Sequence, residues 1–332
     1  MNKKYKLAIV GATGLVGRTV LKVLEEKKLP ISEYKLFSSS RSAGTTLKFM
    51  EKDYIVNELT ENSFDEHFDF AIFSAGSDTS KKFSPIAVSK GCIVIDNSSA
   101  FRMEPTVPLI VPEVNPEKIK ENKGIIANPN CSTIQAVVAL KPLDNKYKIK
   151  RIVYSTYQAV SGAGQKGLDD LNNGLLGKEP KKFPHPIVNN CLPHIDVFLD
   201  NRYTKEEEKM INETRKILDK SNLKITATTV RVPVLNSHSE SINIEFENNF
   251  DLNELIETLK NSPGIIVQDD IKNNVYPLAT NANGYNEVFV GRIRRDFSVE
   301  NGINIWVVSD NIRKGAATNA VQILEKMLED FF

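Results

Sequence analysis

A glycine-rich turn near residue 11 constrains the fold of this chain more than any other feature. Residues 7–10 are an uninterrupted apolar run, which is typical of a parallel strand buried on both faces. Gly11, Gly14 and Gly17 follow, and a helical pattern continues over residues 20–24. Glycines between a strand and a helix let the backbone approach a pyrophosphate, which the helix N-terminus then binds. The spacing departs by one residue from the common GxGxxG fingerprint but predicts the same nucleotide site.

Strands and helices alternate through the first part of the chain. Apolar runs predict three further strands and a helix, at residues 34–37, 69–73, 92–96 and 81–90 respectively. Such alternation is typical of an α/β fold with a Rossmann-type, doubly wound parallel sheet.

The second half of the chain has a different pattern, which predicts an α+β domain. Strands rich in β-branched or alternating residues are expected at residues 150–157, 224–232, 241–246 and 304–308, and amphipathic helices at residues 204–218 and 315–328. Glycine, asparagine, lysine and proline are frequent over residues 162–193, which predicts a long loop there.

The end of the second predicted strand indicates which nucleotide binds. NAD-binding domains place an acidic side chain there, for the ribose 2′-hydroxyl. This chain has serines, Arg41 and Ser42 at residues 38–44, and no carboxylate. A guanidinium and hydroxyl groups suit a 2′-phosphate, so NADP is the expected cofactor. A polar surface loop is the alternative interpretation.

A lone cysteine follows a helix-breaking proline near the middle of the chain. Pro129 ends the preceding element, and Asn130 is a good N-cap for a buried helix that begins at Cys131. Backbone N–H groups at a helix N-terminus stabilise a thiolate, below the free-thiol pKa of roughly 8.5. Cys131 is therefore a candidate nucleophile, and a small buried hydrophobe is the equally weighted alternative.

A cysteine that acts on a carbonyl also needs a group that transfers protons. The chain has four histidines. His67 lies in a charged run and His185 between two prolines, whereas His238 is expected in a turn between two strands, where it can face a cleft. His238 is the candidate acid or base, and a structural histidine is the alternative.

Three basic residues are candidates for binding an anionic substrate. Arg102 follows the strand predicted at residues 92–96, at the sheet edge where ligands bind in α/β folds. Arg231 lies in an apolar strand, where a charge is costly unless it is paired or meets a ligand. Lys209 lies one turn after Glu206 and is equally suited to a routine ion pair on a helix surface.

Charge and cysteine content exclude several function classes. Lys plus Arg (43) nearly balances Asp plus Glu (42), so no net field attracts nucleic acid or an acidic membrane. Cys92, Cys131 and Cys191 form no CxxC pair and no plausible metal set, which favours a reducing cytoplasm and no metal. No apolar run approaches the roughly 18 residues of a membrane span, and the basic start at residues 1–6 has no signal-peptide pattern.

Several ordered motifs between residues 6 and 328 resemble those of the aspartate-β-semialdehyde dehydrogenase family. They are GATGLVG at residues 11–17, SSRSAG at 39–44, DNSSAFR at 96–102, PNCST at 129–133, STYQAVSGAG at 155–164, RVPVLNSHSES at 231–241 and SDN at 309–311. The resemblance implies an NADP-binding domain (residues 1–128 with 312–332), a catalytic and dimerisation domain (residues 129–311), and a homodimer.

The resemblance also implies a reaction. NADPH-dependent reductive dephosphorylation would convert 4-phospho-L-aspartate reversibly to L-aspartate 4-semialdehyde and inorganic phosphate. This step serves the biosynthesis of lysine and diaminopimelate, threonine and methionine. Cys131 would carry the acyl group as a thioester, and His238 would transfer the proton of the thiohemiacetal. Gln158 would orient the intermediate, with Asn130 beside the nucleophile.

Binding residues are implied in the same way. Arg231 would take the substrate α-carboxylate and Glu206 its amino group, while Arg102 and Lys209 would hold the phosphate. The residues that match the family's cofactor contacts are Gly11, Thr13, Gly14, Leu15, Val16, Arg41, Ser42, Ser161, Gly162 and Asn311. The resemblance implies no functional residues within residues 164–193.

Three other functions are alternatives to this one. N-acetyl-γ-glutamyl-phosphate reductase performs the same chemistry on an acetylated substrate, but the free-amine site implied by Glu206 argues against it. A glyceraldehyde-3-phosphate dehydrogenase favours NAD and an acidic residue after the second strand. A non-catalytic paralogue would not be expected to keep Cys131, Gln158, Arg231 and His238 together.

Overall fold

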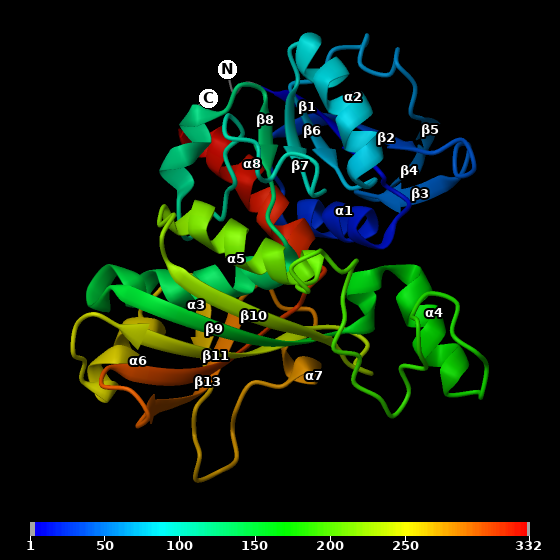
Figure 1. The fold of residues 1–332 in the computed structure, drawn as a ribbon. Coiled ribbons are helices and arrows are strands. Elements are labelled where there is room, and N and C mark those ends of the chain that lie inside the picture. Colours follow the sequence, from blue (N-terminus) through cyan, green and yellow to red (C-terminus); the bar gives the residue numbers. More distant parts are fainter. Residues whose placement is uncertain (1–3, 331–332) are drawn as a thin grey trace. The chain divides into compact units, whose positions relative to one another are not determined.

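The computed structural model describes residues 4–330 and divides the chain into two compact units (Figure 1). The first unit consists of Met1–Pro129 with Ala316–Phe332, and the second of Asn130–Gly315. Residues 1–3 of the basic start lie outside the described residues. The assignment of one unit to NADP binding and the other to catalysis stays a prediction. Across residues 4–330, no helix is both long and apolar enough to cross a membrane.

A parallel six-stranded sheet forms the centre of the first unit, within the described residues. Its strand order is β5, β2, β1, β6, β7, β8. The strands are β1 (Tyr5–Val10), β2 (Ile31–Ser38), β5 (Asn57–Glu58), β6 (Phe70–Phe73), β7 (Ile93–Asp96) and β8 (Ile125–Ala127). The order places β1 in the interior of the sheet, and the predicted doubly wound parallel architecture is confirmed.

Alternate residues of β1 show how helices bury both faces of this sheet. Leu7 and Ile9 belong to a core that includes residues of α1 and α8, whereas Ala8 and Val10 belong to one that includes Ala87 of α2. The helices are α1 (Leu15–Lys27), α2 (Ser77–Ser89) and α8 (Thr318–Asp330), with a 3-10 helix η1 (Pro116–Glu121) and a small hairpin of β3 (Thr46–Phe49) and β4 (Lys52–Ile55). A π-helical turn, η3 (Arg313–Ala317), precedes α8. The C-terminal helix α8 thus packs against the N-terminal sheet and shares its hydrophobic core (Figure 1).

The second unit is built on a mixed sheet, also six-stranded among the described residues, with the order β10, β9, β11, β14, β13, β12. The pairs β9–β10 and β12–β13 are parallel, and the others are antiparallel. The strands are β9 (Ile149–Gln158), β10 (Lys224–Arg231), β11 (His238–Phe246), β12 (Ile265–Val267), β13 (Val288–Asp296) and β14 (Gly302–Ser309). This mixed sheet agrees with the α+β domain that was predicted for the second half of the chain.

Helices pack on the strands of this mixed sheet. They are α3 (Cys131–Tyr147), α5 (Lys205–Leu218) and α6 (Leu252–Lys260); the short helix α7 (Ala279–Ala282) lies by β14. Along β11, buried and half-buried residues alternate strictly, because one face meets helix α3. On β9 and β14, exposed Tyr157 and half-exposed Trp306 form an aromatic pair with ring centroids 5.6 Å apart, so the opposite face carries aromatic surface.

The prediction of a long loop over residues 162–193 is wrong in part. A short 3-10 helix, η2 (Val160–Ala163), is followed by α4 (Gln165–Gly174), which lies within that range. Leu171 of α4 packs with Val160, Ile187 and Leu192 in a small core of its own. This core stabilises a helix whose glycines and asparagines give it low intrinsic propensity.

Candidate active site

Cys131, the candidate nucleophile, lies where it was predicted, at the first residue of α3. Asn130 caps the helix: its Oδ1 accepts from the backbone N–H of Ser132 (3.0 Å) and of Thr133 (3.4 Å). Pro129 and the extended backbone of Asn130 end the preceding segment, so the helix can begin at Cys131. The helix start therefore directs partial positive charge toward the cysteine.

His238 is brought to this cysteine by strand β11. Cys131 Sγ and His238 Nε2 lie 3.2 Å apart. His238 was expected in a turn, but it is the first residue of β11 and is fully buried. The difference arises because the ladder with β14 extends to the pair His238–Ser309, which turns the histidine inward.

The hydrogen bond on the other side of the ring fixes the histidine tautomer. The backbone N–H of Ala159 donates to His238 Nδ1 over 3.0 Å. A backbone amide can only donate, so Nδ1 carries no proton and Nε2 carries it in the neutral ring. Burial, and then the charge of Arg231, hold the pKa of His238 well below its ordinary value. The histidine is consequently neutral at neutral pH and presents an N–H to the cysteine sulfur.

A buried guanidinium lies beside the histidine. Arg231, the last residue of β10, donates through Nη1 to the carbonyl of Ala159 over 2.7 Å. A Cβ atom built on Gly162 would lie 2.7 Å from Arg231 Nη1 and 3.0 Å from His238 Cε1. Gly162 therefore fits between both side chains only because it has none of its own.

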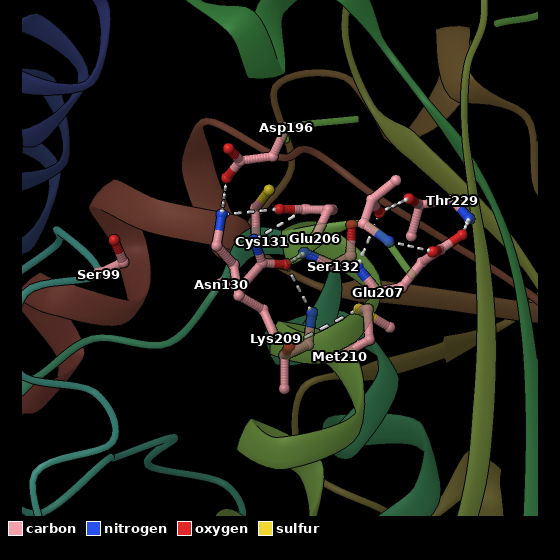
Figure 2. Close-up of polar contacts among 12 residues, drawn as sticks. Ser99, Asn130, Cys131, Ser132, Asp196, Glu206, Glu207, Lys209, Met210 and Thr229 are labelled. Atoms are coloured by element: carbon pink, nitrogen blue, oxygen red, sulfur yellow. Dashed lines mark hydrogen bonds and ion pairs between the residues drawn. The ribbon is translucent and has the colours of Figure 1, made fainter. Parts of the chain in front are cut away.

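Glu206 of α5 connects the predicted residues into one network (Figure 2). Its Oε1 accepts from Asn130 Nδ2 (2.9 Å) and from Gln158 Nε2 (3.3 Å), and its Oε2 lies 3.1 Å from Lys209 Nζ. Lys209 also pairs with Asp196 at 2.8 Å. Despite complete burial, which alone would raise it, the pKa of Glu206 is lowered by Lys209 and Asn130. Glu206 is thus a buried carboxylate whose negative charge is compensated by hydrogen bonds and an ion pair. Lys209 does not form the routine ion pair of a helix surface, because its partner Glu206 is buried.

Asn311, which follows β14, forms hydrogen bonds with two segments near His238: the residue before it and the 3-10 helix η2. Its Oδ1 accepts from the backbone N–H of Ser237 (2.8 Å), and its Nδ2 donates to Ser161 Oγ (3.0 Å). Ser237 has a φ of 72°, a conformation that is costly for a non-glycine residue. The bond from Asn311 stabilises that conformation directly before His238.

Sequence reasoning missed three residues that position this site. Glu213 Oε2 accepts from the backbone N–H of Asn130 over 2.6 Å, and Glu207 accepts from Thr229 N–H of β10 at 3.1 Å. Both acids are buried on the side of α5 that faces the protein interior. Acidic residues on the otherwise apolar face of this amphipathic helix were the sequence signal that could have identified them. A Cβ atom on Gly315 would lie 2.8 Å from the Cβ of Cys131, so this glycine permits close packing.

The glycine-rich turn, in the first unit, has the geometry of a phosphate-binding loop. Gly11 has a φ of 85°, and a Cβ atom on Gly17 would lie 2.1 Å from the carbonyl oxygen of Gly11. Gly14 is the N-cap of α1 and brings no capping side chain, and the first turn holds no acid. Leu15 and Val16 begin the helix, after Thr13 in the turn. Backbone N–H groups at this helix start therefore suit an anion.

The other predicted residues of the first unit lie at carboxyl ends of its strands. Arg41 and Ser42 lie in an exposed to half-exposed turn after β2. Arg102 is buried after β7 and donates from Nε to the carbonyl of Asn128 (2.9 Å) and from Nη2 to that of Asn97 (2.9 Å). These bonds anchor Arg102 at this edge of the sheet.

The second unit thus holds a thiol at a helix N-terminus, a neutral imidazole N–H, a guanidinium and a paired carboxylate. Such a set can form a covalent bond to an acyl group and stabilise the charge that develops on its oxygen. Among residues 4–330, no group of three or more His, Cys, Asp or Glu side chains is arranged to hold a metal ion.

Comparisons with known proteins agree with this geometry. Residues 6–122 match the family model of the semialdehyde dehydrogenase NAD binding domain, and residues 140–314 that of the dimerisation domain. The aspartate-semialdehyde dehydrogenase of Aquifex aeolicus is 58% identical, over 98% of each chain.

Solved structures are similar too. That of aspartate semialdehyde dehydrogenase II from Vibrio cholerae, complexed with ASA, has a TM-score of 0.96 and 45% identity, over 99% of this chain and 100% of that chain. Aspartate semialdehyde dehydrogenase of Candida albicans with NADP has a TM-score of 0.77 and 28% identity, over 98% of each chain. The chain therefore belongs to the aspartate-semialdehyde dehydrogenase family.

Proposed function

We propose that this protein reduces 4-phospho-L-aspartate to L-aspartate 4-semialdehyde and phosphate, reversibly, through a thioester on Cys131. The observation that carries the proposal is the pair formed by Cys131 Sγ and the Nε2–H of His238, 3.2 Å apart at the start of α3. The proposed role in lysine, diaminopimelate, threonine and methionine biosynthesis follows from this reaction.

Cys131 provides the nucleophile. Its thiolate attacks the acyl carbon, the bond from carbon to the phosphate oxygen breaks, and phosphate leaves with the electron pair. Arg231 and the N–H groups of the α3 start favour the thiolate, because they place positive charge beside the sulfur. The product of this step is a thioester on Cys131.

His238 is proposed to stabilise the next intermediate, in place of the proton transfer that the resemblance implies, because loss of a proton from this neutral ring would leave an imidazolate. NADPH, when bound, supplies the hydride that converts the thioester to the oxyanion of a thiohemiacetal. The Nε2–H of His238, in the tautomer that the Ala159 N–H favours, donates a hydrogen bond to that oxygen and stabilises its negative charge. Collapse of the oxyanion breaks the C–S bond, releases the aldehyde and restores the thiolate. The side chains supply the nucleophile, the hydrogen-bond donor and the positive charge, and we propose the reaction without a metal.

Gln158, Arg231 and Glu206 are proposed to orient the substrate. Arg231 offers a planar donor group for the α-carboxylate, and Glu206 offers a carboxylate for the amino group. A free-amine substrate suits this carboxylate better than an acetylated one. Lys209 beside Glu206 is proposed to bind phosphate, as is Arg102 of the first unit, with inorganic phosphate as the co-substrate in the oxidative direction.

The first unit is proposed to bind NADP. The glycine turn packs tightly against neighbouring backbone, because a Cβ atom at Gly11 or Gly17 would collide with it, and we propose that the start of α1 beside this turn binds the pyrophosphate. Thr13, Gly14, Leu15 and Val16 would hold that group, and Arg41 and Ser42 the 2′-phosphate. Ser161, Gly162 and Asn311 are proposed as further cofactor contacts. The family model and the NADP complex of the Candida relative support a nucleotide here.

A cytoplasmic homodimer is proposed as the working form. The match of residues 140–314 to a dimerisation domain supports the dimer. Exposed apolar side chains on this unit, among them Ile271, Val275 and Tyr276, offer surface for it. Sedimentation of the purified protein at micromolar concentration tests this, and a monomer would contradict it.

One assay tests the proposed function. L-aspartate 4-semialdehyde, NADP and phosphate should give NADPH, and omission of phosphate should stop steady turnover. Cys131→Ala should abolish turnover and leave NADP binding nearly unchanged. Exclusive turnover of N-acetyl-γ-glutamyl phosphate in the reductive direction would contradict the assignment, as would an active Cys131→Ala variant.

A further inference from the structure

Helix α3 has a second link to His238, besides the contact made by Cys131. Gln135 lies one turn after Cys131, so the two side chains share one side of the helix. Gln135 is fully buried, and its Nε2 donates to the backbone carbonyl oxygen of His238 over 3.3 Å. The helix that carries the thiol therefore also holds the backbone of the histidine that contacts this thiol.

The acceptor on His238 fixes the orientation of the Gln135 amide. A carbonyl oxygen can only accept, so Nε2 of Gln135, rather than Oε1, faces His238. Oε1 is buried and has no hydrogen-bond partner among the residues that the structure describes. A buried acceptor without a partner is destabilising. Gln135 thus makes one hydrogen bond to His238 and leaves its other polar atom unpaired.

The stability of the protein interior does not explain a glutamine at this position. The residues that flank Gln135 in α3 are buried and apolar: Ile134, Ala136, Val137, Val138 and Ala139. A methionine of similar volume could fill the same space without an unpaired polar atom. What the amide provides, and an apolar side chain would not, is the hydrogen bond to His238.

This hydrogen bond acts where the sheet holds His238 less completely. The ladder between β11 and β9 begins only at Ser239, one residue after the histidine. The Ala159 N–H holds the imidazole ring at Nδ1, and Gln135 holds the backbone at the carbonyl oxygen. Together the two bonds set the position of the Nε2–H, which lies 3.2 Å from Cys131 Sγ when measured from Nε2.

We propose that Gln135 is a positioning residue: it joins the His238 backbone to the helix of Cys131 and so keeps the Nε2–H of His238 within hydrogen-bonding distance of the sulfur. The inference rests on the proposed function, which takes Cys131 as the nucleophile and the Nε2–H as the donor to the oxyanion. Gln135 has no contact with substrate or cofactor in the proposed reaction, and it acts only through His238.

Gln135→Met tests the proposal, because methionine is similar in volume but has no N–H donor. A hydrogen bond from the Nε2–H to the sulfur favours the thiolate. In the variant, the midpoint of Cys131 alkylation by iodoacetamide over a pH series should therefore rise by about half a pH unit, which is about threefold in rate below the midpoint. Alkylation is followed by peptide mass, because Cys191 is exposed and also reacts.

Turnover provides a second measurement on the same variant. The Nε2–H is proposed to stabilise the oxyanion, so its displacement should lower kcat by about tenfold. The KM values for NADP and L-aspartate 4-semialdehyde should stay within about twofold, because Gln135 contacts neither molecule in the proposed reaction.

A His238→Ala background separates positioning from a general effect on α3. If Gln135 acts through the imidazole, Gln135→Met should not move the alkylation midpoint any further in this background. A general disturbance of the helix start would move the midpoint equally with and without the imidazole.

Leu140→Met is the matched control in the same helix. Leu140 is fully buried, and the exchange of leucine for methionine conserves volume without the loss of a hydrogen bond. Its midpoint and kcat should equal those of the unmodified protein. Folding of each variant is checked by Trp306 fluorescence. Gln135→Asn, whose amide is one methylene group shorter, should show the same shifts as Gln135→Met and repeats the test with a polar side chain.

Two results would overturn the proposal. One is an unchanged midpoint or an unchanged kcat in folded Gln135→Met and Gln135→Asn, and the other is an equal shift of the midpoint in the His238→Ala background. The midpoints require no substrate, so they test the position of His238 independently of the reaction. Absence of turnover of L-aspartate 4-semialdehyde by the unmodified protein would instead refute the proposed function.

Discussion

Removal of the helix cap at Asn130 should destabilise the second unit by a predictable amount. Asn130→Ala loses the Oδ1 bonds to the N–H groups of Ser132 and Thr133, and the Nδ2 bond to Glu206. Loss of an N-cap costs about 1 kcal/mol. The lost bond to a buried carboxylate costs about 1.5 kcal/mol, the lower end of its range because Lys209 still pairs with Glu206. The expected loss is about 2.5 kcal/mol.

A companion variant separates the two contributions. Asn130→Ser keeps a hydroxyl that caps the helix but loses the amide donor, so it should lose only about 1.5 kcal/mol. Urea unfolding followed by the fluorescence of Trp306, the single tryptophan, reports on the second unit. Equal stability of the two variants would refute the capping argument. A loss below about 0.5 kcal/mol in Asn130→Ala would refute the whole account of this network.

Three further substitutions probe other parts of the site. Gly162→Ala places a Cβ atom 2.7 Å from Arg231 Nη1, so kcat should fall by roughly tenfold to a hundredfold with little change in unfolding; unchanged kcat would contradict the geometry. Gly17→Ala places a Cβ atom 2.1 Å from the carbonyl oxygen of Gly11, so NADP binding measured by fluorescence should weaken while alkylation of the reactive cysteine stays unchanged. Glu206 has a folded pKa below its ordinary 4.5, so its stabilising contribution is present above that pH and is lost as the pH falls through the lower folded value. Glu206→Gln should therefore flatten acid unfolding in that window, and an unaltered acid limb in calorimetry would count against the paired carboxylate.

The features that could be predicted from sequence depend on short-range chemistry. A proline, a capping asparagine and an apolar run suffice to start a helix at Cys131, and the structure begins α3 there. Alternating strands and helices likewise specify the parallel sheet of the first unit. In both cases, the residues that decide the outcome are close together in the chain.

Long-range contacts account for what sequence reasoning missed. The tautomer of His238 is set by the backbone of Ala159, 79 residues away, which no side-chain pattern reports. Helix α4 depends on a small core with Ile187 and Leu192, so its composition alone predicted a loop. Glu240 of β11 did leave a signal, because it interrupts the apolar face of a strand. Only the structure shows that its carboxyl group is buried without a hydrogen-bond partner among the described residues.

The most direct test of the central claim is a single turnover in the absence of phosphate. The purified protein is mixed with NADP and L-aspartate 4-semialdehyde, and NADPH absorbance and intact mass are followed together. The account predicts a burst of about one NADPH per chain, with an acyl group on Cys131 that added phosphate releases. Steady turnover without phosphate, an acyl group on another residue, or a burst in Cys131→Ala would contradict it.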